Sequence, residues 1–259
     1  FLGRLTAFLP RLEAMEINFS RSLYAVKPAL ERSSDGRSAV VVLRSAAPFA
    51  EIHYTLDNSE PAASSPRYEG PITLNGSSTI KAGLFRDGTL QGRIVTVPFL
   101  VHKASGARVA YTRPWSDRYQ AAGAMALVDG LTGSTNYSDG TWQGFEQHDL
   151  EVVIDLGKKT AVNRVSSSYL ENTGSWIFAP RQVSYAFSDT GDNFKTLALL
   201  PGGGLKNDSE ITIHRFAQDF KDLKARYLKV TATNIGLCPP DHIGAGGKAW
   251  LFVDEIFVE

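Results

Sequence analysis

The feature that most constrains the fold of this chain is a series of short runs in which apolar and polar residues alternate, with clusters of turn residues between them. Alternation with a period of two indicates half-buried β-strands, whereas clusters of Gly, Pro, Asn, Asp and Ser are typical of turns. The runs are not interleaved with the helical patterns that a parallel sheet would require. The sequence therefore predicts an all-β protein made of antiparallel sandwiches.

The runs fall into two blocks, and we expect each block to form a β-sandwich. The first block contains the runs SAVVVLRS, AEIHYTLD, STIKAGLFRDG and GRIVTVPFLVHK. The second block contains the runs LEVVIDLGKK, AVNRVSSSYL, RQVSYAFSDTGDNF, SEITIHRFA, ARYLKVTATN and AWLFVDEIFVE. Residues 104–118 are interpreted as a linker between the blocks. The predicted domains are therefore residues 26–103 and residues 119–259.

The first residues, FLGRLTAFLPRLEAMEINFSRSLY, place large apolar side chains near one stripe of a helix. Pro10 stands inside this pattern and is expected to kink the helix or to begin a new first turn. We therefore expect a short helix within residues 1–25. Two interpretations remain open, because the helix can be the edge of a preceding domain or can pack on the sheet that follows it.

Composition argues against several classes of function. Lys and Arg together number 27, as do Asp and Glu, so the chain of 259 residues has no net charge that would attract nucleic acid or anionic lipid. No apolar run reaches the length of a membrane-spanning helix. Cys238 is the single cysteine, which rules out a disulfide within the chain and a zinc site built from paired cysteines.

The C-terminal stretch HIGAGGKAWLFVDEIFVE combines a glycine-rich loop with an adjacent pair of acids. A dinucleotide loop needs a helix after its glycines, but a strand pattern follows Gly247, so a phosphate site is not expected. The glycines would instead allow a sharp turn and a close approach of the backbone to a ligand. Asp254 and Glu255 lie on a strand, where consecutive side chains point to opposite faces, so they are not expected to form a catalytic acid–base pair. One acid of the pair remains a candidate metal ligand.

The stretch ALVDGLTGSTNYSDGTW is a stronger candidate for a metal site. Asp129 precedes a glycine in a tight turn, and the hydroxyls of Ser134 and Thr135 follow within a compact loop. A hard cation such as calcium prefers many oxygen ligands in a loop of this kind. The alternative is an Asx-turn that holds no ion, because Asp-Gly is a common turn pair. The five histidines are scattered, and no serine lies in a nucleophile elbow.

A tryptophan in a loop is the remaining signal. Trp176, in the stretch ENTGSWIFAP, lies outside the neighbouring strand patterns. Such an indole either packs in the core or is exposed for a ligand, and the core interpretation is stronger for Trp142 and Trp250. A flat apolar ring beside the polar groups of Glu171 and Asn172 would suit a sugar, which has a C–H face and a fringe of hydroxyl groups.

Three segments, taken in order, resemble the C-terminal region of a bacterial glycoside hydrolase family 20 β-N-acetylhexosaminidase. The stretch EIHYTLDNSEPAASSPRYEGPITLNGSSTIKAGLFRDG resembles the immunoglobulin-like C-terminal domain of chitobiases and β-hexosaminidases. The stretches LVDGLTGSTNYSDGTW, LEVVIDLG, VSYAFSDTGDNF, ARYLKV and VDEIFV resemble the F5/8 type C (discoidin) jelly roll, which includes carbohydrate-binding module family 32. The first residues resemble the closing helix of the catalytic barrel. The resemblance implies a short helix, an immunoglobulin-like sandwich and a discoidin-type sandwich.

The resemblance also implies two sites in the second sandwich. A structural calcium would pin two ends of the domain together, with ligands from Asp129, Ser134 or Thr135, Glu255 and the carbonyls near Ala126 and Leu131. Sugars would bind at a rim formed by Ser168–Phe178 and residues 234–248. We expect Trp176 to stack on the sugar, and the other candidate contacts are Tyr169, Glu171, Asn172, His242, Lys248 and Trp250.

The function implied is that of a non-catalytic accessory region that binds glycans ending in galactose or an N-acetylhexosamine and holds the parent enzyme on its substrate. The parent would be exported by a bacterium to the periplasm or cell surface, and its catalytic barrel would be the other partner. This segment is not itself expected to be an enzyme, because its single adjacent Asp-Glu pair lies in the last strand of the jelly roll. The alternative function is a purely structural or protein-interaction module that braces the barrel.

Overall fold

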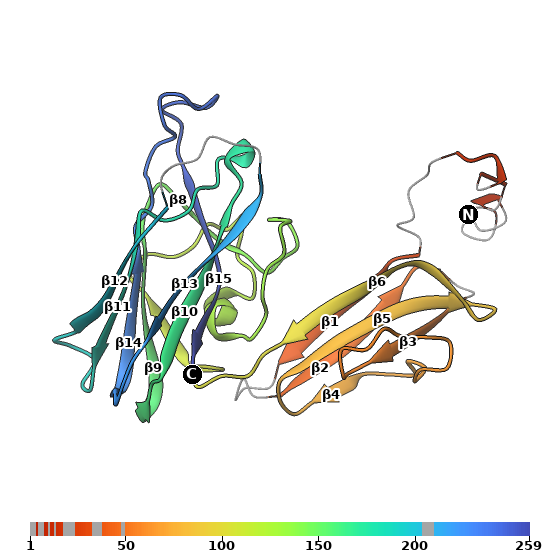
Figure 1. Cartoon of the computed structure of the whole chain (residues 1–259), viewed down its shortest axis with the longest axis horizontal. Coiled ribbons are helices and arrows are strands. Elements are labelled where there is room, and N and C mark those ends of the chain that lie inside the picture. Colours follow the sequence, from red (N-terminus) through yellow and green to blue (C-terminus); the bar gives the residue numbers. More distant parts are fainter. Residues whose placement is uncertain are drawn as a thin grey trace. The chain divides into compact units, whose positions relative to one another are not determined.

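The computed structural model describes residues 24–32, 38–47, 50–203 and 210–259, with residues 4, 8–9, 11–12 and 14–17 before them. The helix predicted within residues 1–25 lies largely outside this described part. The chain divides into two compact units, with the boundary between Leu100 and Val101 (Figure 1). Almost all regular structure is β, and the named strands pair antiparallel, which confirms the all-β prediction. Within the described residues, none of the helical segments has the length and apolar character that a membrane span requires.

In the residues that the structure describes, the first unit forms two three-stranded sheets. One sheet has the order β1-β2-β4, and the other has the order β3-β5-β6. Alternate residues of β2 are buried, as the alternation in SAVVVLRS predicts. The strands are β1 (Val26–Arg32), β2 (Ala39–Ser45), β3 (Glu51–Thr55), β4 (Ile72–Leu74), β5 (Ser78–Arg86) and β6 (Thr89–Phe99).

The second unit is a sandwich of a four-stranded and a five-stranded sheet, with the orders β13-β10-β15-β8 and β12-β11-β14-β9-β7. Apolar side chains from both sheets form one core between them, among them Val152 and Leu228 from one sheet and Val165 and Leu251 from the other. The strands are β7 (Arg108–Tyr111), β8 (Gln143–Glu146), β9 (Leu150–Ala161), β10 (Arg164–Glu171), β11 (Gln182–Ser188), β12 (Lys195–Pro201), β13 (Thr212–Asp219), β14 (Lys224–Ala232) and β15 (Trp250–Val258).

Residues 104–118, predicted as a linker, belong instead to the second unit. They contain β7, which pairs with β9 from Arg108↔Asp155 to Tyr111↔Val152 and forms an edge of the five-stranded sheet. The strand covers only four residues, and its alternation is too short to stand out from the connector around it.

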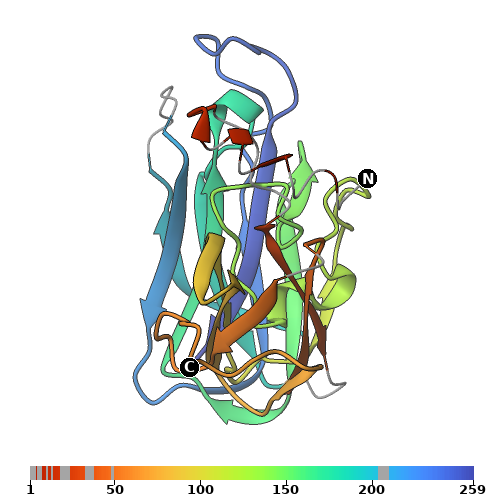
Figure 2. The same cartoon turned by 90° about the vertical axis from the view of Figure 1, so that its right-hand side faces the viewer.

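The last strand, β15, is buried along its whole length between β10 and β8. In Figure 2 it runs the length of the unit, and the loop that precedes it projects beyond the ends of the strands. The pairing with β10 shifts between Ser167↔Ile256 and Tyr169↔Val253, so that Asp254 and Glu255 both lie opposite one residue. This is a β-bulge, and it changes which alternate residues face the core. Leu251 and Val253 face the core before the bulge, and Ile256 and Val258 do so after it.

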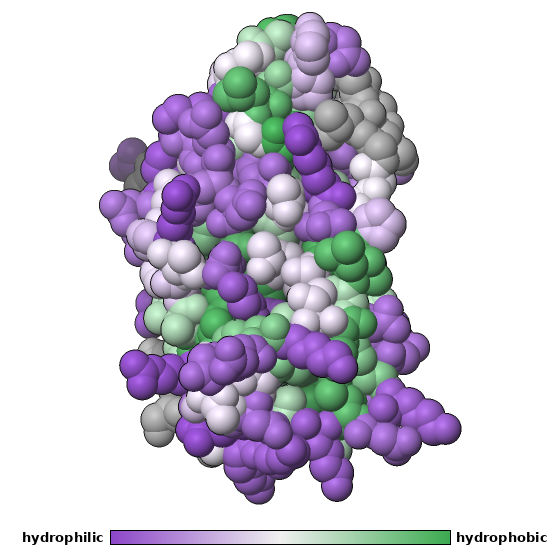
Figure 3. Space-filling view, turned by 90° about the vertical axis from the view of Figure 1, so that its left-hand side faces the viewer, coloured by the Kyte–Doolittle hydropathy of each residue, from purple (hydrophilic) through white to green (hydrophobic). Residues whose placement is uncertain are grey.

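The outer surface carries a few exposed apolar side chains. Polar side chains cover most of the face shown in Figure 3, with smaller apolar patches between them. The edge strand β12 exposes Leu197 and Leu199, the latter at 59%. Scattered exposure of this kind is common on soluble proteins.

The loop before β8 packs too tightly to accept a side chain at Gly133. A Cβ atom there would overlap the ring of Trp142, which is buried and donates its indole N–H to the Ser134 carbonyl. We expect Gly133→Ala to lower the free energy of unfolding by about 1–3 kcal/mol, because overpacking forces a buried ring to move. Urea denaturation measures the change. Gly203→Ala is the control, because nothing lies within 4 Å of a Cβ atom there; equal stabilities of the two variants would contradict the packing described.

Candidate functional site

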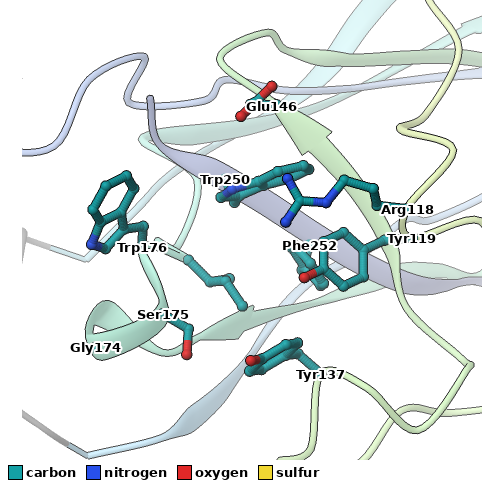
Figure 4. A pocket seen from close by; sticks show the side chains of 10 residues that line it. Arg118, Tyr119, Tyr137, Glu146, Gly174, Ser175, Trp176, Trp250 and Phe252 are labelled. Carbon is teal, nitrogen blue, oxygen red and sulfur yellow. The ribbon is translucent and has the colours of Figure 1, made fainter. Parts of the chain in front are cut away.

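A cleft of about 440 Å³ opens at one end of the second unit. Its walls come from the segment before the short helix η2 (Gly123–Val128), from the loop before β8, from the turn after β10 and from the start of β15 (Figure 4). The lining residues are Arg118, Tyr119, Tyr137, Glu146, Gly174, Ser175, Trp176, Ile177, Trp250 and Phe252.

Four aromatic rings form the floor of the cleft. Trp250 and Phe252 occupy alternate positions of β15 and therefore share one face of the strand, with ring centroids 5.9 Å apart. Tyr119 packs edge-on against both of them, at 5.3 and 4.7 Å, and Tyr137 lies 6.1 Å from Tyr119. Edge-to-face packing at these distances is favourable for aromatic pairs. Trp250 is 8% exposed and Phe252 is 1% exposed, so the floor is a continuation of the core.

Trp176 forms a wall and is 40% exposed. It follows the short helix η3 (Thr173–Ser175) in a left-handed conformation, with φ of 63°. Its indole lies against the glycine-rich loop, because Cβ atoms added at Gly244 and Gly247 would lie 2.6 and 3.1 Å from its ring. Its carbonyl accepts a hydrogen bond from the Trp250 amide at 2.8 Å. The sequence predicted that the backbone at these glycines approaches a ligand closely. In the structure, the backbone approaches the ring of Trp176.

His242 joins the glycine-rich loop to the turn that carries Trp176. The side chain is buried, and its Nε2 atom donates to the Thr173 carbonyl at 2.9 Å. The Nδ1 atom accepts a hydrogen bond from the Gly244 amide at 3.0 Å. Both ring nitrogens are thus used within the protein. His242, predicted as a contact to sugar hydroxyls, positions the wall of the cleft instead.

Two charged side chains of opposite sign lie at the margin of the cleft. The guanidinium of Arg118 lies over the rings of Trp250 and Tyr119, at 5.5 and 5.8 Å from their centroids. Glu146 ends β8, and Figure 4 shows its carboxylate at the edge of the cleft beyond Trp250. Among the described residues, neither charged group has an ion-pair partner within 4.0 Å. Both are available to a ligand.

The structure brings only Trp176 and Trp250 of the predicted sugar contacts into this cleft. Tyr169 is fully buried in the sandwich core, where burial raises its pKa well above the ordinary value. Glu171 is buried and accepts a hydrogen bond from His214 at 2.6 Å.

Two further predicted contacts lie outside the cleft. Asn172 pairs through its backbone with Ile177, and Lys248 is exposed but does not line the cleft. Glu171 and Asn172 are near Trp176 in sequence, but they do not face the same space.

Five residues that line the cleft lie outside both the predicted sugar contacts and the predicted rim: Arg118, Tyr119, Tyr137, Glu146 and Phe252. The stretch PWSDRYQ, dense in aromatic and charged residues, is the signal for the first two, but it overlaps the segment interpreted as a linker. The alternation of Trp250 and Phe252 in β15 could have shown that they share a face.

The adjacent acids of β15 accept hydrogen bonds from the loops around them. Asp254 accepts hydrogen bonds from the amides of Gly133 and Glu255. Glu255 accepts from the amides of Asp129 and Gly130 through Oε2, at 3.1 and 2.9 Å. Its Oε1 atom lies 2.7 Å from the Nε2 atom of His102. Both carboxylates are almost completely buried, and hydrogen bonding is what makes such burial tolerable.

The residues predicted to bind calcium are only partly brought together. Glu255 meets the turn at Asp129, whose Oδ1 atom accepts from the Leu131 amide, as in the alternative Asx-turn. Ser134 is turned to Asp139, to which its hydroxyl donates at 2.7 Å, and Thr135 is exposed. A cation at Glu255 would have to compete with the three donors that this carboxylate already has. The donor set as arranged here does not fit a calcium site, because binding of the ion would require the hydrogen bonds to Glu255 to be replaced.

Comparisons with known proteins give a partial likeness. A family model described as Fn3 associated matches residues 41–99, within the first unit. A search of curated proteins found no match. Among solved structures, the lectin domain of lectinolysin complexed with Lewis B antigen shares 16% identity at a TM-score of 0.40, over 62% of this chain and 97% of that one.

Two further structures come from bacterial glycoside hydrolases. CpGH89CBM32-4 of Clostridium perfringens, in complex with GlcNAc-α-1,4-galactose, shares 14% identity at a TM-score of 0.38, over 61% of this chain and 92% of that one. A Ruminococcus gnavus GH29 fucosidase in complex with fucose shares 16% identity at a TM-score of 0.41, over 61% of this chain. The match spans only 26% of the fucosidase. The neighbours thus include carbohydrate-binding modules. Because every TM-score is below 0.5, we infer nothing about the function of this chain from these neighbours.

Calcium dependence can be tested by thermal unfolding. A calcium site with a dissociation constant of about 10⁻⁴–10⁻³ M would stabilise the protein by about 1.4–2.7 kcal/mol at 10 mM calcium, which would raise Tm by roughly 3–10 °C. We expect no rise above about 1 °C relative to chelator, because protein donors already satisfy Glu255. A larger rise that disappears in Glu255→Gln would contradict this and establish the site.

Asp254 should make stability depend on pH. Burial raises its pKa to about 7 from the ordinary value of 3.8. The folded state therefore binds the proton more tightly than the unfolded state does, and this contribution to stability is complete below about pH 4 and is lost as the pH rises through about 7. We expect the free energy of unfolding of the wild type to fall between pH 5 and pH 8 relative to that of Asp254→Asn. Parallel curves from urea denaturation of the two proteins would contradict the raised pKa.

Proposed function

We propose that the cleft binds a sugar and that the chain is a non-catalytic, glycan-binding accessory region of a β-N-acetylhexosaminidase. The observation that carries the proposal is the indole of Trp176, which is held against the backbone of Gly244 and Gly247 and left 40% exposed beside an aromatic floor. An exposed aromatic ring in a cleft has a cost in water unless a ligand covers it. A volume of about 440 Å³ lies within the range of small-molecule sites.

The chemistry of the margin supports a neutral, polyhydroxylated ligand. The face of a pyranose ring that carries only C–H groups can stack on Trp176. The Arg118 guanidinium offers several N–H donors in one plane, and its position over Trp250 limits its rotation. Glu146 offers acceptors at the same margin. One cation and one anion give no net charge, which favours hydroxyl groups over a phosphate or a carboxylate as the recognised groups.

The role of such binding would be to raise the local concentration of glycan around a catalytic domain in the same parent protein. The sequence resemblance supports a family 20 hexosaminidase as that parent, and with it export from a bacterial cell. Glycans that end in galactose or an N-acetylhexosamine are the ligand classes implied. A catalytic role for this part of the chain has no support from its adjacent acids, because hydrogen bonds to surrounding amides engage both carboxylates.

The proposal predicts that Trp176→Ala weakens sugar binding at least about tenfold, which corresponds to about 1.4 kcal/mol of lost stacking. Calorimetric titration of the whole chain with galactose, N-acetylglucosamine and N-acetylgalactosamine measures the change. Leu199→Ala is the matched control, because it removes an exposed apolar side chain from β12, outside the cleft. We expect this control to bind as the wild type does.

Two outcomes would contradict the proposal. One is the absence of binding to any of these sugars, which would favour a structural or protein-interaction role. The other is binding that Trp176→Ala leaves unchanged, which would place the sugar elsewhere on the chain.

A further inference from the structure

A second cleft, of about 380 Å³, lies at the turn that joins β8 to β9. It is lined by Thr112, Arg113, Gln147, His148, Asp149 and Glu151. None of these residues belongs to the aromatic floor or to the predicted sites. Unlike the first cleft, its lining is polar throughout.

The two clefts share two chain segments. Glu146 lines the aromatic cleft and the next residue, Gln147, lines the polar one. The segment over residues 112–119 also contributes to both clefts, with Arg113 on one side and Arg118 on the other. The turn after β8 is thus a ridge between adjacent clefts.

Hydrogen bonds hold this ridge in place. Gln147 has a left-handed backbone, with φ of 63°, and its amide donates to the Ala249 carbonyl at 2.8 Å, next to Trp250. The Asn234 amide donates to Asp149 at 2.8 Å. The Asn234 side chain also donates to the carbonyls of Phe145 and Ala249. A ridge fixed in this way lowers the entropy that a ligand would lose on ordering it.

The polar cleft has groups that can recognise hydroxyl or acetamido groups. Glu151 is engaged by Lys229 at 2.6 Å, which lowers its pKa. Arg113 has no ion-pair partner within 4.0 Å among the described residues and is exposed. The Nδ1 atom of His148 lies 3.1 Å from the Asp149 carbonyl, which can only accept, so Nδ1 donates there and Nε2 is left to a ligand. No ring offers a flat apolar face for stacking.

We propose that the ligand is a glycan of two or more sugar residues that lies across the ridge. Its terminal sugar stacks on Trp176 in the aromatic cleft, and the next residue of the glycan makes hydrogen bonds with Arg113 and His148 in the polar cleft. This inference rests on the proposed function, because it extends the same site. It adds that the linkage and the second sugar contribute to affinity, so that the chain distinguishes an oligosaccharide from a free monosaccharide.

The test compares ligands of increasing length by calorimetry with the whole chain. Two series serve as probes: N-acetylglucosamine with its β-1,4-linked dimer and trimer, and galactose with lactose. In the series that binds, we expect the disaccharide to bind at least about tenfold more tightly than the monosaccharide. Arg113→Ala and His148→Ala are expected to remove most of this gain and to leave the monosaccharide affinity unchanged. Unchanged monosaccharide binding also shows that each variant is folded.

Arg93→Ala is the matched control, because it removes an exposed arginine from β6 in the first unit. The control is expected to keep the gain with length. Equal affinities for monosaccharide and disaccharide, or a gain that survives both Arg113→Ala and His148→Ala, would overturn the inference and leave the proposed function standing. Failure of every saccharide to bind would overturn both.

Discussion

The burial of β15 is the constraint on which the rest of the second unit depends. A strand that is buried along all nine residues and carries two adjacent carboxylates is stable only if hydrogen-bond donors reach both acids. The amides of Asp129, Gly130 and Gly133 supply most of these donors, so the loop before β8 is bound to the strand. The same strand begins with Trp250 and Phe252, which form the floor of the cleft. The middle of β15 therefore holds the loop before β8, and the start of β15 forms the floor of the cleft. The bulge places the two acids side by side opposite one residue of β10, where a regular strand would have a single residue.

The backbone of Trp176, which forms the wall of the cleft, is strained, and contacts with the surrounding residues offset this strain. A left-handed conformation at a bulky residue such as Trp176 costs about 1–2 kcal/mol. The hydrogen bond from Trp250 to its carbonyl, the packing on Gly244 and Gly247, and the link through His242 all favour this one arrangement. Strained residues that are held in this way tend to occur at functional sites. A wall that is already in place also costs a ligand little ordering entropy on binding.

Much of the fold follows from periodicity, but the site follows from tertiary contacts. Alternation of apolar and polar residues predicts strands such as β2 and β9, because half-buried strands require it. The alternation does not reveal the bulge at Asp254, because a bulge does not change the alternation of the residues that precede it. Trp176 lies in a loop and is partly exposed in the cleft, which is one of the two interpretations that its sequence position allowed. The orientation of Glu171 and His242 could not be predicted, because whether a polar side chain faces a cleft or an internal partner depends on residues distant in sequence, here His214 and Thr173.

The central claim is that a sugar occupies the aromatic cleft, and the four tryptophans offer a direct measurement of it. Trp176 and Trp250 line the cleft. Trp142 is buried beneath the floor, in the same cluster as Trp250 and Phe252, and does not line the cleft, whereas Trp115 packs against the core between the two sheets. The indole N–H signals of the ¹⁵N-labelled chain can be followed by NMR as a binding saccharide is added. We predict that the Trp176 signal shifts most, that the Trp250 signal shifts with it and that the other two remain in place. Saturable shifts confined to Trp115 or Trp142, or no shift at any indole, would contradict the account.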